Sequence, residues 1–245
     1  MKEDALNDVY DNNINVLIII TLLLIILSGR DKTIFFLLVI IIIGNIKRIP
    51  QTNYVNIFLR QTMYFAAFLV PYIDAKNRNF SPMKHSWVLW LAILLPALLF
   101  VLEWKSNKLF FSRKALASYQ LNGKLYIILR IYNLIGAAIC EELFFRAYFL
   151  YGEEAWQLIV SSIAFMGYHK SLPWGKIFGR KNILKQVIFG LISGIFFVYT
   201  NSVIPCVIFH LLYNSITIVL YIKVYIHKYL LKDISYESDE IDLDL

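Results

Sequence analysis

The sequence is poor in cysteine, and its two cysteines, Cys140 and Cys206, both lie in apolar runs. This placement predicts small packing residues and excludes the disulfide framework of a small secreted domain. The N-terminus lacks the basic start of a cleavable signal peptide, because Lys2 is followed by four acidic residues before position 12. The first apolar run is therefore expected to be retained. The sequence also shows no internal repeat.

Apolar residues are abundant: 59% of the 245 residues are hydrophobic, and the mean hydropathy is +0.61. Soluble domains are nearer half apolar, so this composition indicates a polytopic membrane protein. Polar turns separate eight apolar runs, at Ile14–Ser28, Thr33–Ile46, Tyr54–Ile73, Trp87–Leu102, Leu125–Leu150, Trp156–His169, Gln186–Thr200 and Val203–Ile226. We therefore expect an all-α fold, a transmembrane bundle of about eight helices.

The domain organisation follows from these runs. Residues 1–232 are expected to form one transmembrane bundle with its motif-bearing core at about 125–217, followed by an acidic, disordered tail at 233–245. The net charge of +7 does not indicate nucleic-acid binding, because the basic residues are spread over loops between apolar runs. Their excess on the side of the termini predicts a multi-pass cell-membrane protein with cytoplasmic termini. The Ile-, Lys- and Asn-rich composition is typical of an AT-rich bacterium.

The most informative stretch is 140–148, which places two carboxylates and a guanidinium inside an apolar run. Ionisable residues at membrane depth are functional candidates by default. Glu142 and Arg146 are four residues apart, so they share a helix face and can form an ion pair. Glu141 lies about 100° around the helix from Glu142 and is left available for proton chemistry. A charge cluster at a helix end, solvated by head groups, is the alternative interpretation.

Three further polar residues lie in later apolar runs: His169 ends the sixth, and His210 and Asn214 lie one turn apart in the eighth. At about 1.5 Å of rise per residue, Glu141, His169 and His210 all come near the middle of the membrane. Each histidine alone is more simply read as a core residue that bonds to the backbone. Together they predict a shared polar site.

This set of residues can support peptide hydrolysis. Glu141 and His169 can jointly hold and deprotonate a water, while His210 and Asn214 can donate to the oxyanion that forms on the scissile carbonyl. Glu141, His169 and His210 could instead bind zinc, which also lowers the pKa of a water. The sequence has no H-E-x-x-H motif.

The ordered set Glu141-Glu142-x-x-x-Arg146, Phe165-x-x-x-His169 and His210-x-x-x-Asn214 resembles the three motifs of the CPBP family of CAAX proteases and bacteriocin-processing enzymes, also called Abi. This family includes the type II CAAX prenyl endopeptidases. The resemblance covers about residues 126–217. It implies an intramembrane peptidase of about eight helices, with Glu141, His169, His210 and Asn214 catalytic and with Glu142 and Arg146 supporting. It also favours glutamate chemistry without a metal, with zinc as the alternative.

The resemblance implies a membrane-associated peptide or protein as substrate, such as a bacteriocin or pheromone precursor or a CAAX-like protein, processed within the lipid bilayer. Two functions from other classes compete with it. One is a bacteriocin self-immunity protein that protects by binding without hydrolysis. The other is a transporter whose buried Glu, His and Arg residues relay protons. The motif set favours the peptidase.

Overall fold

The computed structural model describes residues 30–46, 48–50, 53–73, 82–102, 104, 108, 111–112, 116, 123–150, 156–171 and 180–231. Within these ranges the fold is all-helical, with seven α-helices and no strand. The α-helices are α2 (Arg30–Ile46), α3 (Tyr54–Ala66), α4 (Val88–Leu102), α7 (Lys124–Glu142), α8 (Gln157–Ser171), α9 (Arg180–Thr200) and α10 (Ile204–Tyr225). A 3₁₀ helix, η1 (Ala67–Ile73), extends α3, and two π-helices, η3 (Leu143–Tyr148) and η5 (Ile226–Leu231), extend α7 and α10.

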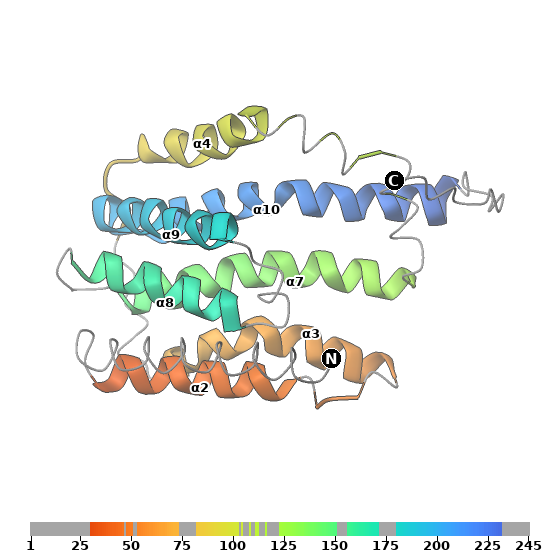
Figure 1. Cartoon of the computed structure of the whole chain (residues 1–245), viewed down its shortest axis with the longest axis horizontal. Helices are drawn as coiled ribbons and strands as arrows, with labels where there is room; N and C mark the ends of the chain where they lie inside the picture. The colour runs from red at the N-terminus through yellow and green to blue at the C-terminus, as the bar shows by residue number, and fades with distance from the viewer. Residues whose placement is uncertain are drawn as a thin grey trace.

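The helices run roughly along one axis and stack in layers (Figure 1). Helices α2 and α3 form one side, α7 and α8 the middle, and α9 and α10 the next layer, which α4 covers. Helix α7 packs against α3 and α10, and α8 packs against α9. The layer order therefore places the end of α7 among α8, α9 and α10.

The all-α prediction is confirmed for the described residues, and seven of the eight apolar runs correspond to helices there. The run at Ile14–Ser28 and the acidic tail at 233–245 lie outside the described residues. Two helical stretches, Ile183–Thr200 and Ile204–Leu230, are long and apolar enough to cross a bilayer. A count of eight transmembrane helices is not established by these helices.

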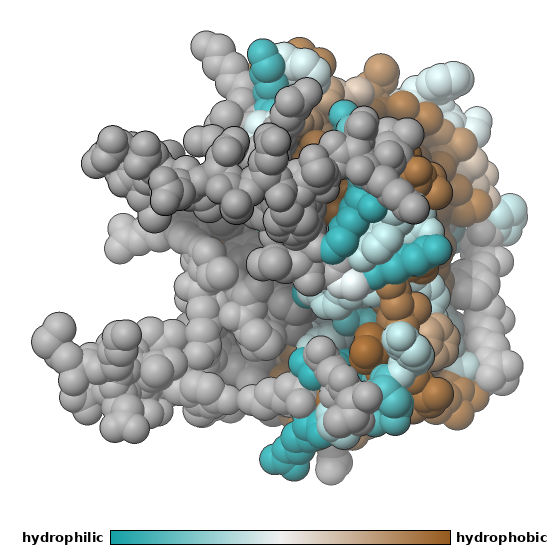
Figure 2. All heavy atoms as spheres, turned by 90° about the vertical axis from the view of Figure 1, so that its right-hand side faces the viewer, coloured by the Kyte–Doolittle hydropathy of each residue, from teal (hydrophilic) through white to brown (hydrophobic). Residues whose placement is uncertain are grey.

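The outer surface of the bundle is rich in large apolar side chains. On α4, Trp90 is 68% exposed and Leu94 58%, and the helix carries no polar residue between Val88 and Leu102. Apolar surface on this scale is unfavourable in water and suits contact with lipid chains. The end of the bundle where α7 begins and α10 ends differs, because hydrophilic side chains gather there between hydrophobic ones (Figure 2).

Close helix contacts depend on glycine at particular positions, as is common between membrane helices. A Cβ on Gly190 of α9 would lie 3.1 Å from the Cα of Ser162 on α8, so this glycine allows the close contact between α8 and α9. A Cβ on Gly136 of α7 would lie 2.6 Å from Cε1 of Phe65, a buried ring on α3. The absence of a side chain at Gly136 therefore allows α7 to approach α3 closely.

We expect Gly136→Ala to destabilise the bundle. Overpacking against the Phe65 ring costs about 1–3 kcal/mol, and the better helix propensity of alanine offsets only about 1 kcal/mol of it. Gly44→Ala is the matched control, because a Cβ there meets no atom within 4 Å and should leave stability equal or higher. Thermal unfolding of the detergent-solubilised variants measures both effects, and equal melting temperatures for the two variants would contradict this packing.

Candidate active site

The site begins where α7 changes its hydrogen-bonding pattern. The α-helix ends at Glu142, and the next six residues, Leu143–Tyr148, form a π-helix. The amide of Phe149 accordingly bonds to the carbonyl of Phe144, five residues earlier. π-helical turns inside α-helices occur frequently at functional sites. The single helix predicted at Leu125–Leu150 is therefore continuous in sequence but irregular directly after the two glutamates.

Side chains from three other elements bond to carbonyls of this irregular segment. The hydroxyl of Tyr72 on η1 donates to the carbonyl of Leu143 at 2.7 Å, and Ser161 of α8 donates to that of Phe145 at 2.7 Å. The ammonium of Lys32 on α2 donates to the carbonyl of Phe149 at 2.6 Å. Since buried carbonyls need partners, these bonds help to hold the π-helical turn in place.

Glu142 is fully buried, and its carboxylate is surrounded by donors. Its Oε2 lies 3.1 Å from Nε of Arg146, which is the ion pair that the four-residue spacing predicted. The same oxygen accepts a hydrogen bond of 2.6 Å from the hydroxyl of Ser193 on α9. Its Oε1 lies 2.8 Å from Nδ1 of His210 on α10. One carboxylate thus connects the end of α7 to two further helices.

Arg146 is also fully buried, and its charge is distributed over several contacts. Its Nη1 donates to the hydroxyl of Ser161 at 3.1 Å, and its guanidinium lies over the ring of Phe165 at 5.2 Å from the centroid. Burying an unpaired guanidinium would be very unfavourable, so Arg146 and Glu142 require each other.

The contact with Glu142 restricts what His210 can do. An ionised carboxylate can only accept, so the proton between the two groups is carried by Nδ1 of His210. In the neutral ring Nε2 then has a lone pair and no proton. His210 can donate from Nε2 only as an imidazolium.

Glu141 faces away from this cluster and toward α8. Its Oε2 lies 3.7 Å from Nε2 of His169, and this buried oxygen accepts no hydrogen bond from the described residues. Nδ1 of His169 lies 3.0 Å from the carbonyl of Phe165 and can only donate to it, which leaves a lone pair on Nε2 of the neutral ring. Tyr168 hydrogen-bonds the same carboxylate. Oε2 of Glu141 and Nε2 of the neutral His169 ring are therefore both hydrogen-bond acceptors, and they lie too far apart for a direct hydrogen bond.

The ring of Phe165 forms a wall common to both clusters. Its centroid lies 4.4 Å from the ring of His169 and 6.1 Å from that of His210. Phe145, the residue beside Arg146, packs edge-on against it at 5.2 Å. The aromatic wall fixes the positions of the two imidazoles relative to the glutamate pair.

Asn214 lies on α10 one turn after His210, with a half-buried side chain. No hydrogen bond joins it to the other predicted site residues within the described ranges, so the pairing of Asn214 with His210 rests on their helical spacing. Among the described residues no three histidine, cysteine or carboxylate side chains gather as metal ligands. The bond from Nδ1 of His210 to Glu142 leaves the lone pair on Nε2 of the neutral ring available to a ligand, so zinc binding by Glu141, His169 and His210 stays a hypothesis.

Sequence reasoning missed three polar side chains of the site: Ser161, Ser193 and Tyr168. Each lies in an apolar run, where hydroxyl groups are easily read as neutral packing residues. One signal was available, because Ser193 directly precedes Gly194 and Tyr168 directly precedes His169. Small or hydroxyl-bearing residues at such positions are typical of helix contacts in membranes.

A family model described as type II CAAX prenyl endopeptidase Rce1-like matches residues 123–216. This segment is similar to the Rce1-like domain. The predicted family is thereby confirmed for the part of the chain that carries all the predicted site residues. No curated protein and no solved structure matches the chain.

The match supports a family of CAAX-type intramembrane proteases for residues 123–216. That family is membrane-embedded, and two helices of the described residues are long and apolar enough to cross a membrane. The match covers less than half of the 245 residues and excludes α2, α3, η1 and α4. The contacts of Tyr72 and Lys32 with the π-helical turn show that these outside elements nevertheless contribute to the site's geometry.

We expect Glu142→Gln to destabilise the protein strongly. The variant leaves Arg146 buried without a counter-charge, and removing one partner of a buried pair costs about 3–5 kcal/mol. The double variant Glu142→Gln with Arg146→Met should recover part of this loss, because it removes the stranded guanidinium. Thermal unfolding in detergent measures the stability of both single variants and of the double variant. If Arg146→Met lowers the stability of the Glu142→Gln protein as much as it lowers that of the unchanged protein, the two groups are independent and the pairing is contradicted.

Proposed function

We propose that the protein is an intramembrane endopeptidase that hydrolyses a peptide bond in a membrane-associated peptide or protein. The observation that carries this proposal is the 3.7 Å gap between Glu141 Oε2 and His169 Nε2. Both atoms are acceptors, and the carboxylate oxygen is buried without a bond from the described residues. A water beside the pair, within hydrogen-bond distance of both atoms, could donate one hydrogen to each. The family of the Rce1-like domain supports the same activity.

The proposed reaction uses Glu141 as general base. As the water oxygen attacks the scissile carbonyl carbon, Glu141 takes a proton, the new C–O bond forms, and the carbonyl oxygen becomes an oxyanion. When the intermediate collapses, the C–N bond breaks and Glu141 returns the proton to the leaving amine. His169 orients the water through Nε2, and its own orientation is fixed by the bond from Nδ1 to the carbonyl of Phe165.

We assign the oxyanion donors to His210 and Asn214. Because Nδ1 of His210 bonds to Glu142, donation from Nε2 requires the imidazolium form. That form gives the cluster of Glu142, Arg146 and His210 a net charge of about +1, which the developing oxyanion would balance. Asn214, one turn further along α10, supplies a neutral N–H donor.

The remaining details of the activity belong to the same proposal. We favour chemistry without a metal, with all proton transfers made by the side chains above. The substrate class is a bacteriocin or pheromone precursor or a CAAX-like protein. We further propose a multi-pass location in a bacterial cell membrane, with cytoplasmic termini and a helix count near eight.

Glu141→Gln tests the proposed base. Loss of a general base should lower the rate of peptide cleavage by about 10²–10⁴-fold, while Asp31→Asn, an exposed carboxylate at the start of α2, should leave it unchanged. The assay uses purified protein in lipid vesicles with a panel of membrane-associated peptides, read by mass spectrometry. Thermal unfolding of each variant confirms that the fold is retained.

Two further arms of this experiment separate the alternatives. A chelator should leave cleavage unchanged; loss of cleavage that zinc restores would replace the glutamate mechanism by a metal-dependent one. Cells that express Glu141→Gln should lose any protection that depends on cleavage. Full protection from a bacteriocin by a variant that cleaves nothing would identify a binding immunity protein and overturn the proposal.

Asn214→Ala tests the oxyanion donor. Removal of one such donor should lower kcat by about 10²–10³-fold with little change in KM, because the bond forms in the transition state. Asn45→Ala is the matched amide control, since Asn45 is exposed and donates within its own helix to the carbonyl of Ile41. A change in KM alone would place Asn214 in substrate binding instead.

A further inference from the structure

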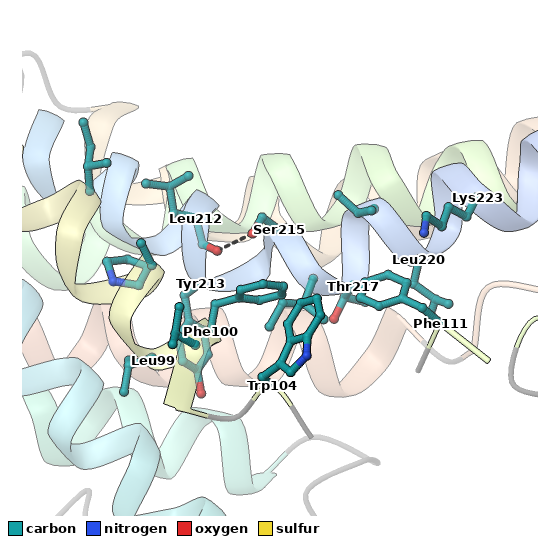
Figure 3. A pocket seen from close by; sticks show the side chains of 16 residues that line it. Leu99, Phe100, Trp104, Phe111, Leu212, Tyr213, Ser215, Thr217, Leu220 and Lys223 are labelled. Carbon is teal, nitrogen blue, oxygen red and sulfur yellow. Dashed lines mark hydrogen bonds between the residues drawn. The ribbon is translucent and has the colours of Figure 1, made fainter. Parts of the chain in front are cut away.

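A second feature lies away from the glutamate site, on the other face of α10. A groove of about 820 Å³ runs between α4 and the later part of α10. Its walls are mainly apolar and aromatic, and Figure 3 shows Leu99 and Leu212 toward one end, Trp104 and Phe111 further along, and Lys223 at the other end. The hydroxyl of Ser215, one of its few polar groups, donates back to the carbonyl of Leu212 at 2.6 Å. The groove is therefore an apolar slot with one charged end.

The groove follows the helix axis, so its depth can be compared with a bilayer. From Leu212 to Lys223 along α10 the rise is about 17 Å. One leaflet is half of a hydrocarbon core about 30 Å thick. Lys223 lies in the last third of the apolar helix Ile204–Leu230, and Leu212 lies at the end of its first third. Lys124, the first residue of α7, lies against Tyr225, so Lys223 is close to one end of the bundle. The slot is about as long as one leaflet is thick.

The end of the groove at Lys223 carries positive charge. Lys223 is exposed, and its ammonium lies 4.7 Å from the centroid of the Phe111 ring, where a second ligand can still reach it. Lys124, also exposed, lies against Tyr225 at the same end of α10. Within the described ranges no carboxylate pairs with Lys223. A basic group at an interface attracts anionic head groups, and Trp104 suits the same depth.

We propose that the groove between α4 and α10 binds one acyl chain of an anionic glycerophospholipid, with the lipid phosphate at Lys223. The apolar length of the groove matches an acyl chain, and its basic end at Lys223 matches the phosphate. The groove also runs along the helix axis, as a lipid chain does in a bilayer. Phosphatidylcholine carries a phosphate too, but its quaternary ammonium cancels that charge nearby, so a lipid with net negative charge is attracted more strongly to Lys223. The site does not depend on the proposed peptidase chemistry, because none of the groove's lining residues is a proposed catalytic residue.

Photoactivatable lipids test this site. The protein is reconstituted in phosphatidylcholine vesicles that contain a small fraction of phosphatidylglycerol or phosphatidylcholine with a diazirine in the acyl chain, and the crosslinked peptides are mapped by mass spectrometry. We expect phosphatidylglycerol to label peptides from 93–104 and 212–223 at least several-fold more than phosphatidylcholine does. Equal labelling by the two lipids, or labelling mainly elsewhere, would overturn the proposal.

Five variants locate the effect. Lys223→Gln should abolish the preference for phosphatidylglycerol, whereas Lys84→Gln, an exposed lysine before the other end of α4, should keep it. Ala97→Phe should fill the groove and lower labelling by both lipids, whereas Leu98→Phe, outside the groove, should not. Glu141→Gln should label like the unchanged protein, so loss of catalysis and loss of this site are distinguishable. Retained preference in Lys223→Gln would contradict the assignment.

Discussion

The arrangement of the site depends on one buried carboxylate, that of Glu142. A charge at zero exposure is stable only if it is paired and hydrogen-bonded, and here the partners come from three different segments: Arg146 in the π-helix forms the ion pair, and Ser193 in α9 and His210 in α10 form the hydrogen bonds. Any shift of one of these helices would leave a buried charge or a buried hydroxyl without its partner. The electrostatic requirement of Glu142 therefore fixes the positions of the helices that carry the other functional groups.

Glu141 and Glu142 are adjacent in the sequence but have different roles. Adjacent positions on a helix point about 100° apart, so Glu142 points into the cluster of donors while Glu141 points toward His169. The first carboxylate is saturated by its partners, and the second keeps an oxygen that accepts nothing from the described residues. The saturated group gives structural order, and the unsaturated group keeps the capacity to bind and deprotonate a water.

Much of this could be predicted from sequence, because helical spacing is a local property. The apolar runs gave the described helices, and the four-residue spacing gave the ion pair of Glu142 with Arg146. Contacts between helices are not local, so the bond from His210 to Glu142 and the contribution of Ser193 were not predicted. The π-helical turn also left no signal, since the residues that form it, Leu143–Tyr148, suit an α-helix equally well.

The π-helical turn explains why the elements before the Rce1-like domain matter to a site that lies wholly within it. In a π-helical turn, some carbonyls lose the partner that a regular α-helix would give them and need another hydrogen-bond donor. Two of the observed donors, Tyr72 and Lys32, precede residue 123, where the Rce1-like match begins. These bonds help to position the start and the end of the turn, and Arg146 lies between them. Sequence change in the early helices can therefore alter the charge cluster without touching any residue of the three motifs.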